Sequence, residues 1–107
     1  MKLADFEMAD SALKRLRGLM FRREIGKPLV FIFPRKARAE NAIHAFFVFF
    51  PFDAIFLDEG KRVVDVRGRI APFTPLVVPR KPAKFLVEAG AGWAKRNGIR
   101  VGGKLYF

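Results

Sequence analysis

Two residues that could perform acid–base chemistry lie in the aromatic stretch HAFFVFFPFDAIFLD, residues 44–58. His44 is the only histidine of the chain, and Asp53 is a carboxylate inside a run of six phenylalanines. A histidine beside a carboxylate can act as a general base. The two residues are nine positions apart, so on one uninterrupted strand they would face opposite ways, although a bulge at Pro51 would restore the parity. The only serine, Ser11, does not stand in a nucleophile motif.

Glu88 is a second acid in an apolar segment, FLVEAG. With Asp53 it could form a carboxylate pair of the glycosidase type. A buried carboxylate is costly unless it is paired, so the structural alternative is that each acid meets an arginine. We favour that alternative and expect Arg17 to pair with Asp53 or Glu88. Other candidate partners of Asp53 are Arg22, His44 and backbone amides freed by a strand break at Pro51.

Basic residues provide a second type of candidate site. Lys and Arg number 21 against 10 Asp and Glu, a formal net charge of +11. This charge favours an anionic partner such as nucleic acid, a membrane surface or a phosphorylated ligand, and solubility alone explains it equally well. Two clusters in expected loops would form a polyanion-binding face if they converged, and a dispersed arrangement is the alternative. These clusters are Arg35, Lys36 and Arg38, and Arg80, Lys81 and Lys84.

Composition limits the class of protein. The 107 residues suit one domain, 1–107, and 51% hydrophobic residues indicate a globular chain. The absence of cysteine excludes disulfides and thiolate metal sites, and we expect no metal or other cofactor. The N-terminus lacks the apolar core of a signal peptide, and no apolar run is long enough for a membrane span. We therefore expect a soluble cytoplasmic protein, while its oligomeric state stays open.

The pattern of short apolar segments predicts a mainly β fold, a sandwich or barrel-like domain with one or two short helices. Thirteen phenylalanines suit a buried core better than an exposed platform for stacking bases. Expected strands span 2–8, 28–33, 42–50, 53–58, 61–70, 84–90 and 99–107, with Pro51 as a break. Expected helices span 9–20 and 92–98, and the proline-rich segment 71–84 is expected to be a loop.

Four segments together resemble an uncharacterised family, the domain of unknown function 192, also called uncharacterised protein family 0127. They are RLRGLMFRREI, PLVFIF, PFDAIFLDEGKRVVDV and FLVEAGAGWAKRNGIRVGGKL, in that order. The resemblance covers about residues 13–105 and implies a small mainly β fold without an assigned activity. The family's signature positions correspond to Arg17, Gly18, Leu19, Met20, Asp53, Glu88 and Gly92. Where many relatives carry Phe-Trp-Met-Lys-Asn-Thr, residues 43–48 read Ile-His-Ala-Phe-Phe-Val, so a polar site there would be lost or changed.

These observations leave three functions open. The leading hypothesis is a non-enzymatic binding or accessory domain with an unknown ligand. The second is binding of nucleic acid or another polyanion through the basic loops. The third is an enzyme that uses Asp53 and Glu88, with His44 as a further candidate, and it requires that these side chains converge in an open pocket.

Overall fold

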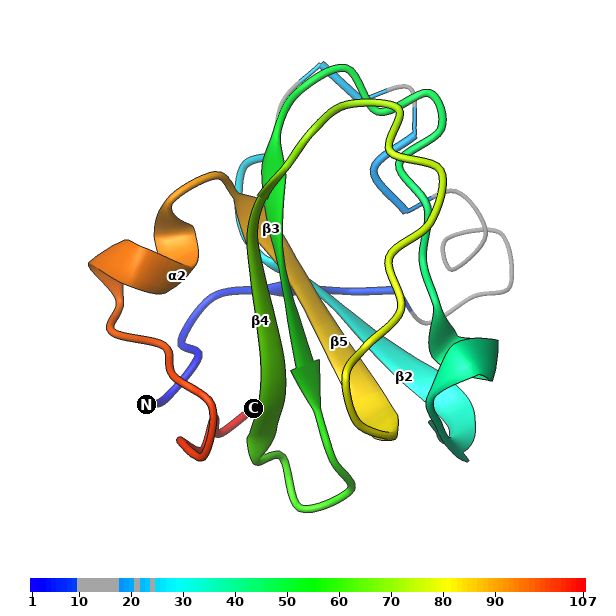
Figure 1. Cartoon of the computed structure of the whole chain (residues 1–107). Helices are drawn as coiled ribbons and strands as arrows, with labels where there is room; N and C mark the ends of the chain where they lie inside the picture. The colour runs from blue at the N-terminus through cyan, green and yellow to red at the C-terminus, as the bar shows by residue number, and fades with distance from the viewer. Residues whose placement is uncertain (10–17, 21, 24) are drawn as a thin grey trace.

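A mixed five-stranded sheet forms the centre of the protein (Figure 1). The computed structural model describes residues 1–9, 18–20, 22–23 and 25–107. The strands span Glu7–Met8 (β1), Leu29–Ala37 (β2), Phe52–Leu57 (β3), Val63–Ile70 (β4) and Ala83–Gly90 (β5), and they are ordered β1-β2-β5-β3-β4. The helical segments Ala39–Asn41 (η1) and Trp93–Arg96 (α2) are short. The prediction of a small, mainly β fold with short helices is confirmed.

The strand register decides which side chains can meet. β5 is the central strand and pairs antiparallel with both β2 and β3. Asp53 lies opposite Ala89, and Ala54 lies opposite Glu88. Directly opposed residues share one face of a sheet, and successive residues alternate between faces. Asp53 and Glu88 therefore project from opposite faces.

Each face of the sheet carries its own hydrophobic core. One core joins Phe31, Phe56 and Leu86 of the sheet to Ala45, Val48 and Val77 of the covering segments. The other joins Ile55, Leu57 and Val87 to Leu3, Ala94 and Leu105, so α2 and both chain ends cover the second face (Figure 1). The side chains of β3 are buried along its whole length. The continuous apolar run of residues 52–57 is typical of a strand that is covered on both faces.

The expectation of a strand over 42–50 is wrong. Ile43 makes one isolated bridge to Val77, and the chain then turns, with Ala45 O accepting hydrogen bonds from Val48 N and Phe73 N. β3 already pairs with β4 and β5, so this segment instead crosses the sheet face as a cover. Phe46, Phe47 and Phe49 are consequently 45–59% exposed, and the expectation that the phenylalanine run is buried holds only for part of it.

The other expected strands and helices are confirmed only in part. β3 begins directly after Pro51, and the strands expected over 61–70 and 84–90 and the helix over 92–98 are confirmed as β4, β5 and α2. The segment expected as a last strand forms only isolated bridges, from Arg62 to Lys104 and from Lys2 to Tyr106. The first helix falls mostly on residues 10–17, outside the described residues. Within the described ranges, no helix has the length and apolarity that a membrane span requires.

Candidate functional site

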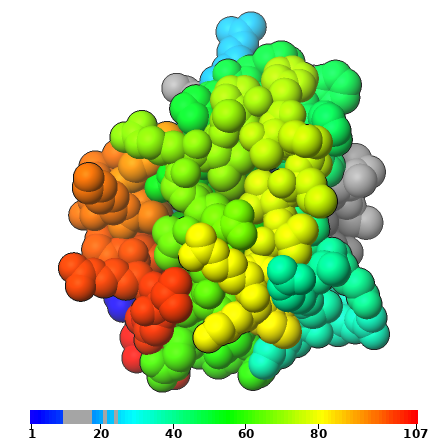
Figure 2. Space-filling model, in the orientation of Figure 1, coloured from blue at the N-terminus to red at the C-terminus, as the bar shows by residue number. Residues whose placement is uncertain are grey.

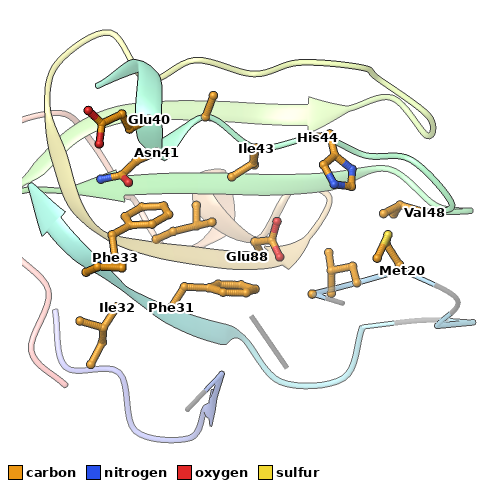
Figure 3. Close-up of a pocket in the computed structure, with 15 residues that line it drawn as sticks. Met20, Phe31, Ile32, Phe33, Glu40, Asn41, Ile43, His44, Val48 and Glu88 are labelled. Carbon is orange, nitrogen blue, oxygen red and sulfur yellow. The ribbon is translucent and has the colours of Figure 1, made fainter. Parts of the chain in front are cut away.

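A cavity of about 420 Å³ opens between the first face of the sheet and the segments that cover it (Figure 3). Its apolar walls come from the sheet, from the segment before β3 and from the turn that follows Gly18. They include Met20, Phe31, Phe33, Ile43, Val48 and Leu86. Its volume lies in the range of small-molecule sites, roughly 300–1,000 Å³.

Glu88 places a carboxyl group inside this apolar cavity. Figure 3 shows its side chain pointing from β5 into the space between Phe31 and the segment that carries Ile43 and His44. The residue is only 5% exposed, and no described residue forms a hydrogen bond with its Oε1. Burial raises the pKa of Glu88 to about 8, against a smaller opposing effect of the Arg22 charge. At neutral pH this carboxyl group is therefore mostly protonated and can donate a hydrogen bond.

Arg22 does not neutralise Glu88 directly, because its guanidinium group is bound elsewhere. Arg22 Nη2 lies 3.1 Å from Glu7 Oε1, and Nη1 lies 3.4 Å from Glu7 Oε2. Both side chains are about one-third exposed. The positive charge of Arg22 thus lowers the pKa of Glu88 without direct contact, and Arg22 forms its ion pair with Glu7.

Three further polar residues line the cavity, and they have different tasks. Glu40 is exposed and is paired with Arg35. Asn41 is buried, and its Nδ2 donates to the carbonyl oxygens of Arg35, Ala37 and Ala83, so its amide nitrogen fastens η1 to β2 and β5. His44 is exposed, and its Nδ1 accepts a hydrogen bond from Phe46 N at 3.2 Å. The neutral imidazole therefore carries its proton on Nε2, which can serve as a donor at the rim of the cavity.

Gly18 lets the backbone pass close to Glu88. Its φ of +51° lies in the left-handed region, which glycine adopts without strain. A Cβ atom at this position would lie 3.5 Å from both Glu88 Oε1 and Phe31 Cζ. A side chain at this position would therefore stand against the carboxyl group and narrow the cavity.

Asp53 is on the other face and is part of a structural network. Its Oδ1 accepts hydrogen bonds from Arg69 N at 2.9 Å and Gly92 N at 3.3 Å, and its Oδ2 accepts one from Ala94 N at 2.9 Å. Backbone amides were among its expected partners, but these amides come from β4 and the start of α2 and not from the break at Pro51. Asp53 therefore ties α2 to the sheet.

The structure thus separates the residues of the proposed polar cluster. Glu88 and His44 line one cavity, and Asp53 faces away from it. An acid–base site that combines Asp53 with Glu88 is not formed, because the sheet lies between them. The expected pairing of Arg17 with Asp53 or Glu88 lies outside the described residues.

Sequence reasoning missed a third buried acid, Asp65. It is fully buried and accepts hydrogen bonds from Arg67 Nε at 2.9 Å and from Arg80 N at 3.0 Å. Arg80 Nε lies 3.8 Å from its Oδ1. The available signal was an acid between two valines inside the alternating segment 61–70. Asp65 anchors the loop before β5 and so helps to place the basic residues of that loop.

The two basic clusters meet at one end of the sheet. The expectation that they lie in loops is wrong for half of their residues, because Arg35 and Lys36 belong to β2 and Lys84 to β5. Ala37 pairs with Ala83, and Arg38 Nε donates to Arg80 O at 3.3 Å. Lys84 Nζ donates to Phe33 O and Pro34 O of β2. Figure 2 shows the two segments side by side, in teal and yellow. Three of the six cations have acidic partners, since Arg35 pairs with Glu40, Lys36 with Glu59 and Arg80 with Asp65.

Comparison with known proteins places this architecture among uncharacterised relatives. Residues 2–107 match the sequence model of the DUF192 family, described as "Uncharacterized ACR". A protein of uncharacterised family 0127 from Thermococcus kodakarensis is 40% identical over 96 residues, 90% of this chain and 60% of the relative. A relative from Pyrococcus abyssi is 40% identical over 99 residues, 92% of this chain and 82% of its own length. The chain thus spans less than two thirds of the first of these relatives.

Solved structures share the fold. A crystal structure of a protein of unknown function from Novosphingobium aromaticivorans matches with a TM-score of 0.83 at 26% identity. The match covers 92% of this chain and 71% of that protein. A structure from Sinorhizobium meliloti also has a TM-score of 0.83, at 22% identity over 92% of this chain and 78% of that protein. At that identity the second likeness concerns the fold alone.

Proposed function

The chain belongs to the DUF192 family, in which no activity is assigned, and from this premise we propose that it is a small-molecule-binding module whose site is the Glu88 cavity. The observation that carries the proposal is the state of Glu88. Its Oε1 has no hydrogen-bond partner in the described part of the chain, although it is buried in a cavity that is open to ligands. Leaving a buried polar atom unpaired costs about 1–3 kcal/mol, and a ligand that pairs with it removes that cost.

The chemistry of the cavity selects the class of ligand. The walls are apolar and aromatic, so most of the ligand must be apolar. A protonated Glu88 donates a hydrogen bond, which fits an acceptor such as a carbonyl oxygen. An anionic ligand would find no lysine or arginine among the described residues that line the cavity, and Arg22 is already paired with Glu7. We therefore infer an uncharged, mainly apolar molecule with one hydrogen-bond acceptor.

Binding of the fluorescent ketone prodan tests this proposal, because prodan is uncharged and carries one carbonyl acceptor. We expect saturable binding below the pKa of Glu88, about 8, and weaker binding above it, where the carboxylate would face the ketone oxygen. The variant Glu88→Gln keeps a neutral donor and should bind prodan at all these pH values. The variant Glu88→Leu keeps an apolar side chain and lacks the donor, so its affinity should fall about tenfold.

Comparison of the two variants distinguishes the contribution of the Glu88 hydrogen bond to prodan affinity from that of the apolar cavity walls. Circular dichroism melting of each variant checks that the fold is intact. Equal prodan affinity for wild type, Gln and Leu variants at every pH would refute a role of Glu88 in binding. Loss of binding in Glu88→Leu with pH-independent binding in Glu88→Gln would support it.

A second candidate function, polyanion binding, is favoured by the meeting of the two basic loops. Among the six cations at this end of the sheet, Arg38, Lys81 and Lys84 form no ion pair with any described acid, and Arg80 is largely exposed. Fluorescence anisotropy with short DNA and RNA, at about 50 and 200 mM salt, tests it. Reversal of Arg38 and Lys81 to Glu should abolish salt-sensitive binding. Reversal of Arg100, an exposed arginine after α2, serves as the control for net charge.

A further inference from the structure

A second hollow, of about 360 Å³, lies beside α2 on the opposite face of the sheet from the Glu88 cavity. The residues that line it include two cationic ones, Arg69 and Lys95, together with Asp53 and Gly92. Arg69 comes from β4, and Lys95 and Gly92 come from α2 and its N-cap. The sheet and α2 thus bring charged groups from distant parts of the chain to one place.

Two guanidinium groups approach each other beside Gly92, which lines this hollow. A Cβ atom at Gly92 would lie 2.8 Å from Arg96 Nη1 and 3.4 Å from Arg69 Nη2. In the described part of the chain, neither arginine forms an ion pair with a carboxylate. Arg96 Nη1 donates only a long hydrogen bond, 3.4 Å, to Ala91 O. Guanidinium groups that converge without forming an ion pair to a carboxylate indicate a place for an external anion.

Asp53 positions this pair and does not saturate it. Its two oxygens accept hydrogen bonds from the backbone amides of Arg69, Gly92 and Ala94. The bond to Arg69 N holds that residue at a φ of +52°, a left-handed conformation that is rare for arginine. Strain of this kind persists where the surroundings enforce it, and it is concentrated at functional sites. In the described part of the chain Asp53 forms no ion pair with Arg69, Lys95 or Arg96, so these positive charges are left for a ligand.

We propose that this hollow binds a phosphate group, either as free phosphate or as a phosphate monoester. Guanidinium forks match the oxygens of phosphate in geometry, and the lysine adds a point charge. Two arginines and a lysine suit the dianionic form better than the singly charged diester. Gly92 keeps the meeting point of the two guanidinium groups free of a side chain. The recognition rests on side chains, since the amides at the start of α2 already bind Asp53.

NMR titration of the full chain with inorganic phosphate, phenyl phosphate and dimethyl phosphate at low salt tests the proposal. We expect saturable shifts of the Gly92 and Ala94 amides with the first two compounds and much weaker shifts with the diester. Arg69→Gln and Arg96→Gln should each weaken phosphate binding about tenfold, the usual scale for a charge-assisted hydrogen bond. Arg100→Gln removes the same charge outside the hollow and should change affinity less than twofold.

Gly92→Ala tests geometry without changing charge. Its Cβ atom would push the Arg96 side chain away, so binding should weaken although both arginines are present. Thermal melting accompanies each variant, and the two Gln variants keep the proposal testable if Gly92→Ala does not fold. Equal weakening in Arg100→Gln, or equal binding of dimethyl phosphate, would overturn a dianion site and leave only a general charge effect. Absence of saturable phosphate binding in the wild type would also overturn it.

Discussion

The two acids on opposite faces of the central sheet, Asp53 and Glu88, are equally hidden but differently satisfied. Asp53 is 1% exposed and accepts three backbone hydrogen bonds. Glu88 is 5% exposed, and its Oε1 has no hydrogen-bond partner in the described ranges. Both carboxyl groups are therefore removed from water. Their hydrogen-bond partners decide whether each group serves the fold or is available to a ligand.

This difference shows why a buried acid alone does not identify a functional site. Backbone amides compensate the desolvation of Asp53 and fix α2 on the sheet, so its removal should harm the fold. Glu88 lacks such compensation and responds by a raised pKa, to about 8. Its removal should leave the fold intact and change how the cavity interacts with ligands.

The largest expected effect is that of Asp53→Ala. The substitution leaves three amide groups, those of Arg69, Gly92 and Ala94, without their acceptor. We expect a loss of about 4 kcal/mol in the free energy of unfolding, measured by urea denaturation near neutral pH. Asp53→Asn keeps one acceptor oxygen and should lose less. A loss below about 1 kcal/mol for the Ala variant would mean that solvent replaces the carboxylate without difficulty.

Glu88 should make stability depend on pH in a defined direction. Its folded-state pKa of about 8 lies above the ordinary value of 4.5, so between these pH values the folded state holds a proton that the unfolded state has released. Stability should be highest near the lower value, decline as the pH rises towards about 8 and then become constant. We expect a decline of about 3 kcal/mol between pH 5 and pH 8, since one pKa unit corresponds to about 1.4 kcal/mol.

Glu88→Gln provides the matched comparison, because glutamine has the same shape and no titration. Urea denaturation at several pH values should give a flat profile for this variant and a higher stability than wild type at pH 8. Glu40→Gln, which changes an exposed acid, should keep the wild-type slope. A wild-type profile that is already flat between pH 5 and pH 8 would contradict the raised pKa.

Much of the fold could be predicted because the apolar periodicity of several segments agrees with their surroundings. The alternation in β4 and the continuous apolar run of β3 are examples. The segment 42–50 has the same composition as a buried strand. Both edges of β3 are already paired, with β4 and β5, and only the tertiary arrangement reveals this. The sequence likewise identifies Asp53 and Glu88 as unusual acids. Their separation on two faces depends on the register between β3 and β5, which composition does not encode.

The convergence of cations was likewise only partly predictable. Arg38 and Arg80 were singled out because they lie in expected loops, and the pairing of Ala37 with Ala83 brings these loops together. Arg96 stands in a basic pair with Lys95, but nothing in the sequence links this pair to Arg69. The approach of the two arginines above Gly92 follows from the hydrogen bonds of Asp53 to β4 and α2, which no sequence spacing indicates.

Gly18→Ala, a substitution beside the Glu88 cavity, should reduce stability by an intermediate amount. The φ of +51° costs an alanine about 1–2 kcal/mol, and the added methyl group would stand 3.5 Å from Glu88 Oε1. Urea denaturation should show this loss, and prodan affinity should fall because the cavity is narrower. The matched control is Gly26→Ala, since a Cβ atom at Gly26 meets no neighbour within 4 Å. Unchanged stability and prodan affinity in Gly18→Ala would mean that the backbone at residue 18 adjusts freely.

The smallest effect is expected for Glu40→Gln, which removes an exposed acid and completes the comparison with the buried ones. Glu40 binds Arg35 with two hydrogen bonds, one of them 2.9 Å from Nε to Oε2, but both side chains are more than 60% exposed. Exposed ion pairs add little stability because water and salt screen them. The urea midpoint should therefore stay at the wild-type value. Nucleic-acid affinity should increase if the basic end of the sheet binds polyanions, because Arg35 would then lose its competing carboxylate. A lower midpoint would show that this surface pair supports the fold, as the hydrogen bonds of Asp53 do.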